Sequence, residues 1–386
     1  MLMVSRSMAL AARVGLVGLA CTAHALLVPC TSSAQDSVDI PSQAAVIKQV
    51  DRFGEGNVEA SRAVRALSNV PASRLPEVLT AMNGASPLSA NWFRAAVEAI
   101  ADRDPQAVPV PELLGFLRDR SNGPYARGLA FDLVVDREPD SREALIETFL
   151  DDPCLELRYM AIEQGMNRVR ELASNEENEA ATAGYTALLE AARNPDQITS
   201  IAAELEKLGS PVDLTEHFGF VTAWHLIGPF DNRDKIGFEA VYAPEDTIDL
   251  AGVYAGKEGE LKWSQHRTEE ANGVVNLNVA VGKHMGAVGY AFTTIVVPDD
   301  IVAEVRLGSP NGNQVWINGE LVISNHVYHA GNSIDQYAGR VTLLKGENHI
   351  LVKVCQNEQT DSWAQDWQFQ LRLCDASGKK IEWQEK

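Results

Sequence analysis

Cysteine is scarce in this sequence of 386 residues, which holds five. Two of them lie before residue 35, in a segment that we expect to be removed, which leaves Cys154, Cys355 and Cys374. An odd number argues against a disulfide framework. Cys355 and Cys374 end two strands that we expect to pair, with Cys355 opposite about Trp367, so that Cys374 lies beyond its reach. We therefore expect free, buried thiols, with a Cys355–Cys374 bridge as the alternative.

Basic clusters are also missing. The chain has 33 Lys and Arg against 53 Asp and Glu, a net charge of −20, and no Arg-rich run. Nucleic acids and anionic membrane surfaces both need concentrated positive charge for binding, so we expect neither as a partner. The acidic excess is interpreted as a source of solubility.

Long apolar runs are absent after the N-terminus, so we expect no membrane span. At the N-terminus, Arg6 and Arg13 precede an apolar stretch over residues 14–28, and the small residues Ser32 and Ala34 follow. This order predicts a signal peptide over residues 1–34, cleaved near Ala34. The protein is therefore expected to be exported, to a periplasmic or extracellular location.

Catalytic motifs are mostly lacking. The sequence has no His-Glu-x-x-His, no Gly-x-Ser-x-Gly, no Walker loop and no Cys-x-x-Cys. The Gly-rich stretch at 308–313 lies between predicted strands, where a phosphate cradle is not expected. No pair of carboxylates stands out for glycoside cleavage among so many acidic residues. We expect a protein that is not an enzyme, with a polysaccharide-acting hydrolase or its accessory subunit as an alternative.

The first half of the chain contains a repeat. Four helix-like segments begin near residues 61, 92, 125 and 156, and their first arginines recur about every 32 residues, at Arg62, Arg94, Arg127 and Arg158. Helix-like segments at 76, 111 and 142 precede the last three of them. Two helices per repeat predict an α-α solenoid over residues 42–208. We expect the arginines to join neighbouring repeats through hydrogen bonds to carbonyl groups or to an Asp in the next loop.

This half resembles HEAT-like repeats, in which an Ala-rich second helix carries an arginine near its start. Tetratricopeptide repeats or another α-α repeat remain open as alternatives. The resemblance implies an extended surface for a protein partner and no chemistry of its own.

The composition changes after a linker over residues 209–217, and short alternating strands predict an antiparallel β-sandwich or jelly roll over residues 218–386. In "QVWINGELV" at 314–322, Asn318-Gly319 predicts a two-residue hairpin turn. Ile317 should then face Glu320, and Trp316 should face Leu321. By strand alternation we expect Trp316 to belong to the core.

Four segments carry a second resemblance: "GYAFTTIVVP", "VRLGSPNGNQVWINGELV", "VTLLKGENHILVKV" and "WQFQLRLCDASG". Together they resemble the galactose-binding-domain-like sandwich, a sugar-binding-like module of many glycoside hydrolases. "WHLIGPFDN" at 224–232 resembles a lead-in found beside such modules in exported bacterial multidomain proteins. The resemblance implies a ligand site in long loops at one end of the sandwich.

Two loops supply the candidate ligand-binding residues. Trp363 and Trp367 lie in the polar stretch "NEQTDSWAQDWQF", and flat aromatic rings stack on the C–H faces of sugars. The segment "SNHVYHAGNSIDQY" at 324–337 follows the hairpin and adds His326, Tyr328, His329, Asn332, Asp335 and Gln336.

No metal or cofactor is expected at these loops. His326 and His329 are three residues apart, so in an extended chain they point to opposite faces, which does not suit zinc. A structural Ca²⁺ held by Asp335, Asp361 or Asp366 is the alternative.

The sequence thus favours an exported, non-catalytic binding protein. Its repeats would bind a protein, and its sandwich would bind a carbohydrate or a cell-envelope polysaccharide. A structural adaptor without a small ligand is the third hypothesis, after the hydrolase.

Overall fold

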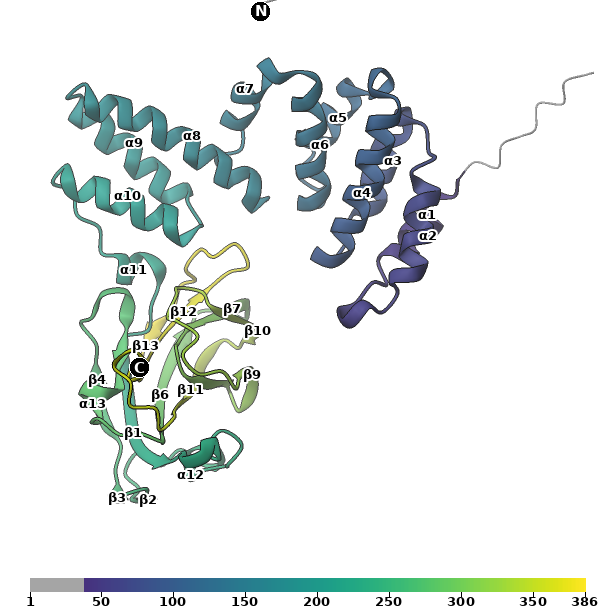
Figure 1. The fold of residues 1–386 in the computed structure, drawn as a ribbon. Helices are drawn as coiled ribbons and strands as arrows, with labels where there is room; N and C mark the ends of the chain where they lie inside the picture. The colour runs from purple at the N-terminus through teal and green to yellow at the C-terminus, as the bar shows by residue number, and fades with distance from the viewer. Residues whose placement is uncertain (1–37) are drawn as a thin grey trace, which may run out of the picture.

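The structure is a computed structural model that describes residues 38–386, so the predicted signal peptide over residues 1–34 lies outside the described residues. The chain has helices first and antiparallel sheets afterwards, which confirms the mixed layout. We call residues 40–218 the helical part and residues 223–386 the β part. Figure 1 shows the helices in a curved row, with the β part attached through the last of them. Within residues 38–386, no helix is both long and apolar enough to cross a membrane.

The helical part consists of helices joined by short connections, several of them single 3₁₀ turns. The α-helices are α1 (Ile40–Ile47), α2 (Asn57–Leu67), α3 (Leu75–Met82), α4 (Pro87–Arg103), α5 (Val110–Arg118), α6 (Pro124–Arg137), α7 (Arg142–Glu147), α8 (Leu155–Ser174), α9 (Asn178–Ala191), α10 (Pro195–Lys207) and α11 (Leu214–Phe218). Proline occupies the first turn of several of them, where its missing N–H costs nothing. The segment 209–217, expected as a plain linker, holds most of α11, which Asp213 caps by accepting a hydrogen bond from the N–H of Glu216.

Arg127 of α6 joins two helical pairs, as the sequence predicted. Its side chain is 1% exposed and forms a bidentate ion pair with Asp152, with Nη1–Oδ1 at 2.6 Å and Nη2–Oδ2 at 2.7 Å. Its Nε also donates to the carbonyl of Leu117 at 2.9 Å. Asp152 lies in the connection between α7 and α8, so one arginine fixes α5, α6 and the start of α8 together.

The other recurring arginines follow this pattern to different degrees. Arg158 of α8 donates to the carbonyls of Asp152 and Ala191, at 2.7 and 3.2 Å. Arg94 of α4 reaches Asp132 of α6 at 3.2 Å, in an exposed ion pair. Arg62 is exposed, and its side chain has no hydrogen-bond or ion-pair partner among residues 38–386. The predicted contacts, to carbonyls or to an Asp in a loop, are therefore found at Arg127 and Arg158, whereas Arg94 pairs with an Asp inside α6 and Arg62 has no such contact.

The β part contains two main sheets. Its strands are β1 (Ala223–Asp231), β2 (Tyr254–Gly256), β3 (Gly259–Leu261), β4 (Ser264–Arg267), β5 (Val275–Asn276), β6 (Ala287–Val297), β7 (Ile301–Gly308), β8 (Gly312–Ile317), β9 (Glu320–Asn325), β10 (Tyr337–Leu343), β11 (Gly346–Gln356), β12 (Gln368–Cys374) and β13 (Gln384–Glu385). The larger sheet has the order β4-β1-β6-β11-β8-β9, with β13 also on β6, and the smaller has the order β10-β7-β12-β5. Short helices α12 (Ala243–Asp246) and α13 (Leu277–Ala280) lie between strands.

The two sheets share one apolar core between their inner faces. It contains Ala291 and Ile295 of β6, Val315 and Ile317 of β8, and Val305 of β7, with equivalent residues of the other strands. The segment "WHLIGPFDN", expected as a lead-in, supplies β1, which pairs with both β4 and β6 inside the larger sheet.

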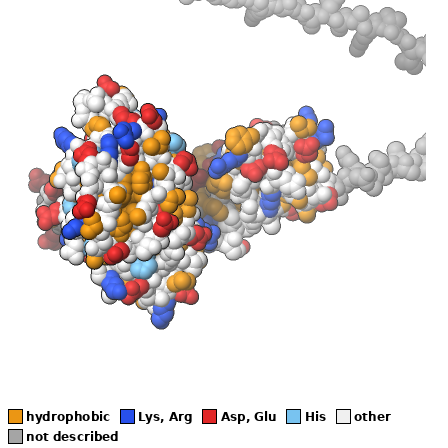
Figure 2. All heavy atoms as spheres, turned by 90° about the horizontal axis from the view of Figure 1, so that it is seen from below, with side chains coloured by type: hydrophobic (Ala, Val, Ile, Leu, Met, Phe, Trp, Pro, Cys, Tyr) orange, Lys and Arg blue, Asp and Glu red, His pale blue; other side chains and the backbone are white. Residues whose placement is uncertain are grey.

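The outer face of the larger sheet is covered as well. Residues 232–263, which we call the strap, cross it and bury aromatic rings such as Phe230, Tyr290 and Phe292 under Phe238 and Trp263. The end of the β part that carries α12, β2 and β3 in Figure 1 faces the viewer in Figure 2, and hydrophobic side chains gather on it.

The hairpin prediction is confirmed. Ile317 pairs with Glu320 and Trp316 with Leu321, and Asn318 and Gly319 both have positive φ, at 52° and 85°. The placement of Trp316 in the core was wrong. Ile317 takes the inner position, so alternation turns Trp316 to the outer face, where it is half-buried.

The predicted pairing of the two cysteine-bearing strands was also wrong. Cys355 of β11 faces Val288 and Gly312, whereas Cys374 belongs to β12 in the other sheet. Cys154, Cys355 and Cys374 are all buried, free thiols, as expected.

Candidate functional site

The two loops predicted from the sequence meet at one end of the β part. The β9–β10 loop and the β11–β12 loop touch where Nδ2 of Asn357 lies 3.0 Å from Nε2 of His329. The ring of Trp363 packs edge-on against His329, with 5.3 Å between centroids. Because this pair comes from two loops that the sequence separates, the structure supports their grouping into one surface, which we call the end-loop cluster.

A third segment, which the sequence analysis missed, completes the end-loop cluster. His326 stacks on Phe238 of the strap with 4.2 Å between ring centroids. Nδ2 of Asn232 lies 3.2 Å from the hydroxyl of Tyr328, and burial raises the pKa of that hydroxyl to about 12. Lys235 places its Nζ 5.4 Å from the Tyr328 ring centroid. The signal in the sequence was the polar "DNRDK" directly after the strand at 224–231.

Trp363 is an exposed large aromatic side chain of this cluster. Its side chain is 65% exposed, although it sits on a short 3₁₀ turn between two buried strands. Its indole therefore offers a flat apolar face to solvent beside His329.

Trp367 was wrongly placed among the exposed binding residues. It is completely buried, and its Nε1 donates to the carbonyl of Val354 at 3.1 Å. A ring in the inter-sheet core cannot stack on a ligand in solvent. Trp367 directly precedes β12 and continues the alternation of its side chains, so its ring points into the core together with that of Phe369. The sequence analysis had assigned it to the polar loop.

A buried polar network supports both loops from below. Nδ2 of Asn311 donates to Oε1 of Gln356 at 2.8 Å and to the carbonyl of Asp366 at 2.9 Å, and Gln356 donates to the carbonyl of Ala364 at 3.0 Å. Satisfied buried amides of this kind fix loop geometry, because each unmade bond would cost desolvation energy. The Gly-rich stretch at 308–313 therefore acts as the frame of the end-loop cluster.

The remaining candidates of the 324–337 loop have different surroundings. Gln336 accepts a hydrogen bond from the N–H of Ser309 at 3.1 Å, and its Nε2 donates to the carbonyl of Ala330 at 3.3 Å. It thus holds the loop in shape. Asn332 is exposed and belongs to the surface that a ligand could reach.

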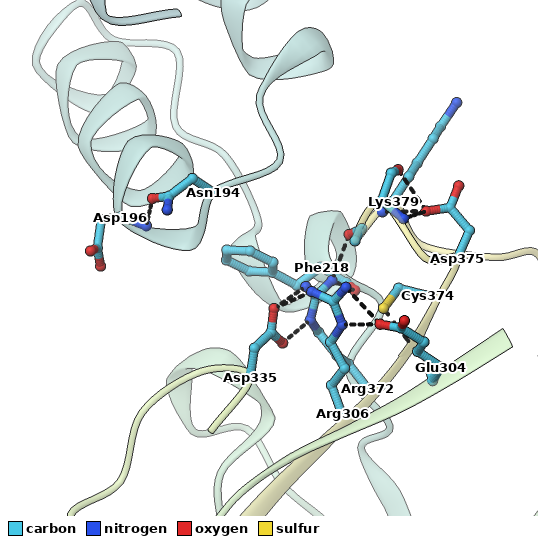
Figure 3. Close-up of polar contacts among 12 residues, drawn as sticks. Asn194, Asp196, Phe218, Glu304, Arg306, Asp335, Arg372, Cys374, Asp375 and Lys379 are labelled. Carbon is cyan, nitrogen blue, oxygen red and sulfur yellow. Dashed lines mark hydrogen bonds and ion pairs between the residues drawn. The ribbon is translucent and has the colours of Figure 1, made fainter. Parts of the chain in front are cut away.

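Asp335 is a structural residue, contrary to the expectation of a ligand contact. Its Oδ1 and Oδ2 each accept from Arg372 at 2.6 Å, and Oδ2 also accepts from Arg306 at 2.7 Å. Figure 3 shows this cluster beneath Phe218, whose carbonyl accepts from Arg372 at 3.3 Å. Burial alone would raise the pKa of the Asp335 carboxyl, but the hydrogen bonds from Arg372 and Arg306 outweigh it and hold the pKa below its usual value. The cluster joins the β part to α11.

No metal site is found at these loops. Asp335 is committed to the two arginines, and Asp361 accepts from the side chain of Gln359 at 3.1 Å. Across residues 38–386, no three His, Cys, Asp or Glu side chains come close enough to hold an ion.

Several residues of these loops and of the strap have left-handed backbone conformations. Asp234, Lys235, His329 and Asp335 adopt left-handed conformations, with φ between 54° and 63°. Non-glycine residues seldom do so, and such positions collect where a surface is shaped for function.

Comparisons with known proteins add little. No family model matches the chain, and no curated protein matches it. Among solved structures, a β-glucosidase from Kluyveromyces marxianus in complex with glucose shares 19% identity over 25% of this chain and 11% of that chain, with a TM-score of 0.18.

Two other solved structures show similarly limited overlap. An anti-sigma factor domain-containing protein from Clostridium clariflavum shares 14% identity over 41% of this chain and 44% of its own, with a TM-score of 0.25. A GH31 α-xylosidase from Xanthomonas citri shares 12% identity over 40% of this chain and 16% of its own, with a TM-score of 0.19. The chain spans less than half of the length of each of these three structures. With such TM-scores, the likenesses carry no argument about fold or function.

Proposed function

We propose that this chain is an exported, non-catalytic binding protein whose β part is a galactose-binding-like sandwich that binds carbohydrate. The observation that carries the proposal is the exposure of Trp363 beside His329. The other tryptophans of the chain, all within residues 38–386, are buried or half-buried. A single exposed indole on a braced loop offers a flat apolar face for a sugar ring.

Polar side chains of the same two loops suit hydroxyl groups. Asn332 and Asp361 are exposed, and the amide of Gln359 is partly exposed. Sugar hydroxyls both donate and accept, so amides and carboxylates around an aromatic ring satisfy them. The acidic balance of the chain favours a neutral saccharide over a uronic acid polymer.

In this proposal the helical part is a HEAT-like solenoid that binds a protein partner. Its extended row of helices and exposed apolar side chains, Phe53 and Tyr159 among them, support this role. The test is whether a protein that co-purifies stoichiometrically with the wild-type chain is lost with Phe53→Asp or Tyr159→Asp. Retention of that protein by both variants would contradict a role for these residues.

The carbohydrate proposal is tested by titrating the full chain with cellohexaose, xylohexaose and mannohexaose while following tryptophan fluorescence. We expect Trp363→Ala to weaken binding at least about tenfold, which corresponds to about 1.4 kcal/mol. Phe53→Ala is the control, because it removes an exposed aromatic ring from the helical part. Unchanged affinity in Trp363→Ala would refute the end-loop cluster as the site. Release of reducing ends during the titration would refute the non-catalytic assignment.

A further inference from the structure

An open groove lies on the outer face of the larger sheet, away from the end-loop cluster. One wall is the strap from Pro244 to Leu250, including the end of α12. The floor and opposite wall come from β6, β8 and β11 and from the Asn318-Gly319 turn. We call it the strap groove. Its volume is about 550 Å³, within the range of about 300–1,000 Å³ usual for small-ligand sites.

The floor of the strap groove is aromatic and apolar. Trp316 lines it half-buried beside Leu351, which lies between Trp316 and Phe292 across the sheet. The imidazole of His349 stacks on Phe292 with 5.6 Å between ring centroids and 27° between the planes. A flat apolar floor of this kind matches the C–H face of a pyranose ring. It also explains why a tryptophan occupies the outer position of the hairpin.

The strap wall is held rigidly on the sheet. Glu245 accepts from Nζ of the buried Lys353 at 2.9 Å and from the hydroxyl of Tyr290. The next residues, Asp246 and Thr247, are exposed toward the groove, and neither side chain has a hydrogen-bond partner within residues 38–386. Next to the anchored Glu245, Asp246 therefore offers a free carboxylate and Thr247 a free hydroxyl at the edge of the groove.

The charges of the strap groove select against anions. Glu245 is paired with Lys353, and Glu347 is paired with Lys386 at 2.7 Å. Asp246 remains as an uncompensated negative charge. A ligand with apolar faces and neutral polar edges fits this floor and rim, whereas a phosphate or uronate would be repelled.

We propose that the strap groove binds a neutral oligosaccharide, with Trp316 as the stacking platform and Asp246 as a hydrogen-bond acceptor for its hydroxyls. This inference rests on the proposed carbohydrate-binding function and adds a separate site to it. Leu351 in the groove and Gln356 under the end-loop cluster are five residues apart on β11, or about 17 Å. One sugar ring therefore cannot contact Trp316 and Trp363 together, so the two sites can be tested separately.

The test is isothermal titration calorimetry of the full chain with cellohexaose, xylohexaose and mannohexaose, with polygalacturonate as the acidic control. We expect Trp316→Ala and Asp246→Ala each to weaken binding at least tenfold in the Trp363→Ala background, where the strap groove is the remaining site. Asp246→Ala alters only an exposed side chain, so it decides the test if Trp316→Ala unfolds. A thermal melt of each variant supplies the folding control.

The outcomes separate the two claims. Loss of all binding in Trp363→Ala alone overturns the strap groove and leaves the end-loop proposal intact. Binding that survives Trp363→Ala unchanged and is lost in Asp246→Ala supports the groove and refutes the end-loop site. Undiminished binding in Asp246→Ala overturns the groove, and binding of none of the three neutral oligosaccharides overturns both. Tight binding of polygalacturonate would contradict the charge argument.

Discussion

Replacing Arg127 by Met tests whether a buried arginine joins the helical pairs. The change removes the bidentate ion pair with Asp152 and the hydrogen bond to Leu117, and it leaves a carboxylate that is 1% exposed. Breaking a buried pair from one side costs about 3–5 kcal/mol, because the remaining charge stays desolvated. Arg120 lies 3.9 Å from Asp152 and can partly replace the lost partner. We therefore expect the free energy of unfolding to fall by about 3 kcal/mol, the lower end of that range.

The assay is urea unfolding of the full chain followed by far-ultraviolet circular dichroism, which reports on the helices. Arg94→Met is the matched control, since Arg94 is another of the regularly spaced arginines but forms an exposed pair with Asp132. That variant should lose at most about 1 kcal/mol. Adding Asp152→Asn to Arg127→Met should restore part of the stability by removing the buried charge. Equal losses in Arg127→Met and Arg94→Met would refute the reasoning.

Three further predictions concern the β part. Because Lys353 anchors the strap through Glu245, Lys353→Met should lower the free energy of unfolding by about 3 kcal/mol, and adding Glu245→Gln should recover part of that loss. The measurement is urea unfolding followed by tryptophan fluorescence. An unchanged midpoint in Lys353→Met would argue against that anchor. Burial raises the pKa of Cys355 to about 12 and of Cys374 to about 11. Neither thiol should therefore react with Ellman's reagent at pH 8 until denaturant is added. Rapid labelling of these thiols in the native chain would contradict this prediction. The lowered pKa of Asp335 contributes stability that is present above about pH 4 and is lost as the pH falls further. The Asp335→Asn variant should therefore be less stable than the wild type at pH 7, and its stability should depend less on acid pH. A pH profile of stability like that of the wild type would refute this role of Asp335.

Much of the fold was predictable because its signals are local. Helical periodicity and prolines in first turns mark the helices, and the Asn318-Gly319 turn fixes the register of its hairpin. The recurring arginines even indicated the buried ion pair at Arg127. These features depend on residues that are close together in the chain, so they can be predicted from the sequence alone.

The site was predicted only in part, because burial depends on which strands meet. Trp363 and Trp367 lie in the same polar loop, yet the start of β12 takes Trp367 into the core and leaves Trp363 in solvent. Asp335 lies among exposed polar residues in the sequence but pairs with Arg372, which is far along the chain. The covering of the outer face by the strap is equally non-local, and it decides that Trp316 lines a groove.

The central claim is that the end-loop cluster binds carbohydrate through Trp363. The most direct measurement is depletion of the full chain from solution by insoluble cellulose, xylan and mannan, with wild type and Trp363→Ala compared at equal concentration. The account predicts saturable depletion of the wild type by at least one of these polymers and markedly less depletion of Trp363→Ala. Equal depletion of both proteins, or no depletion by any polymer, would contradict it.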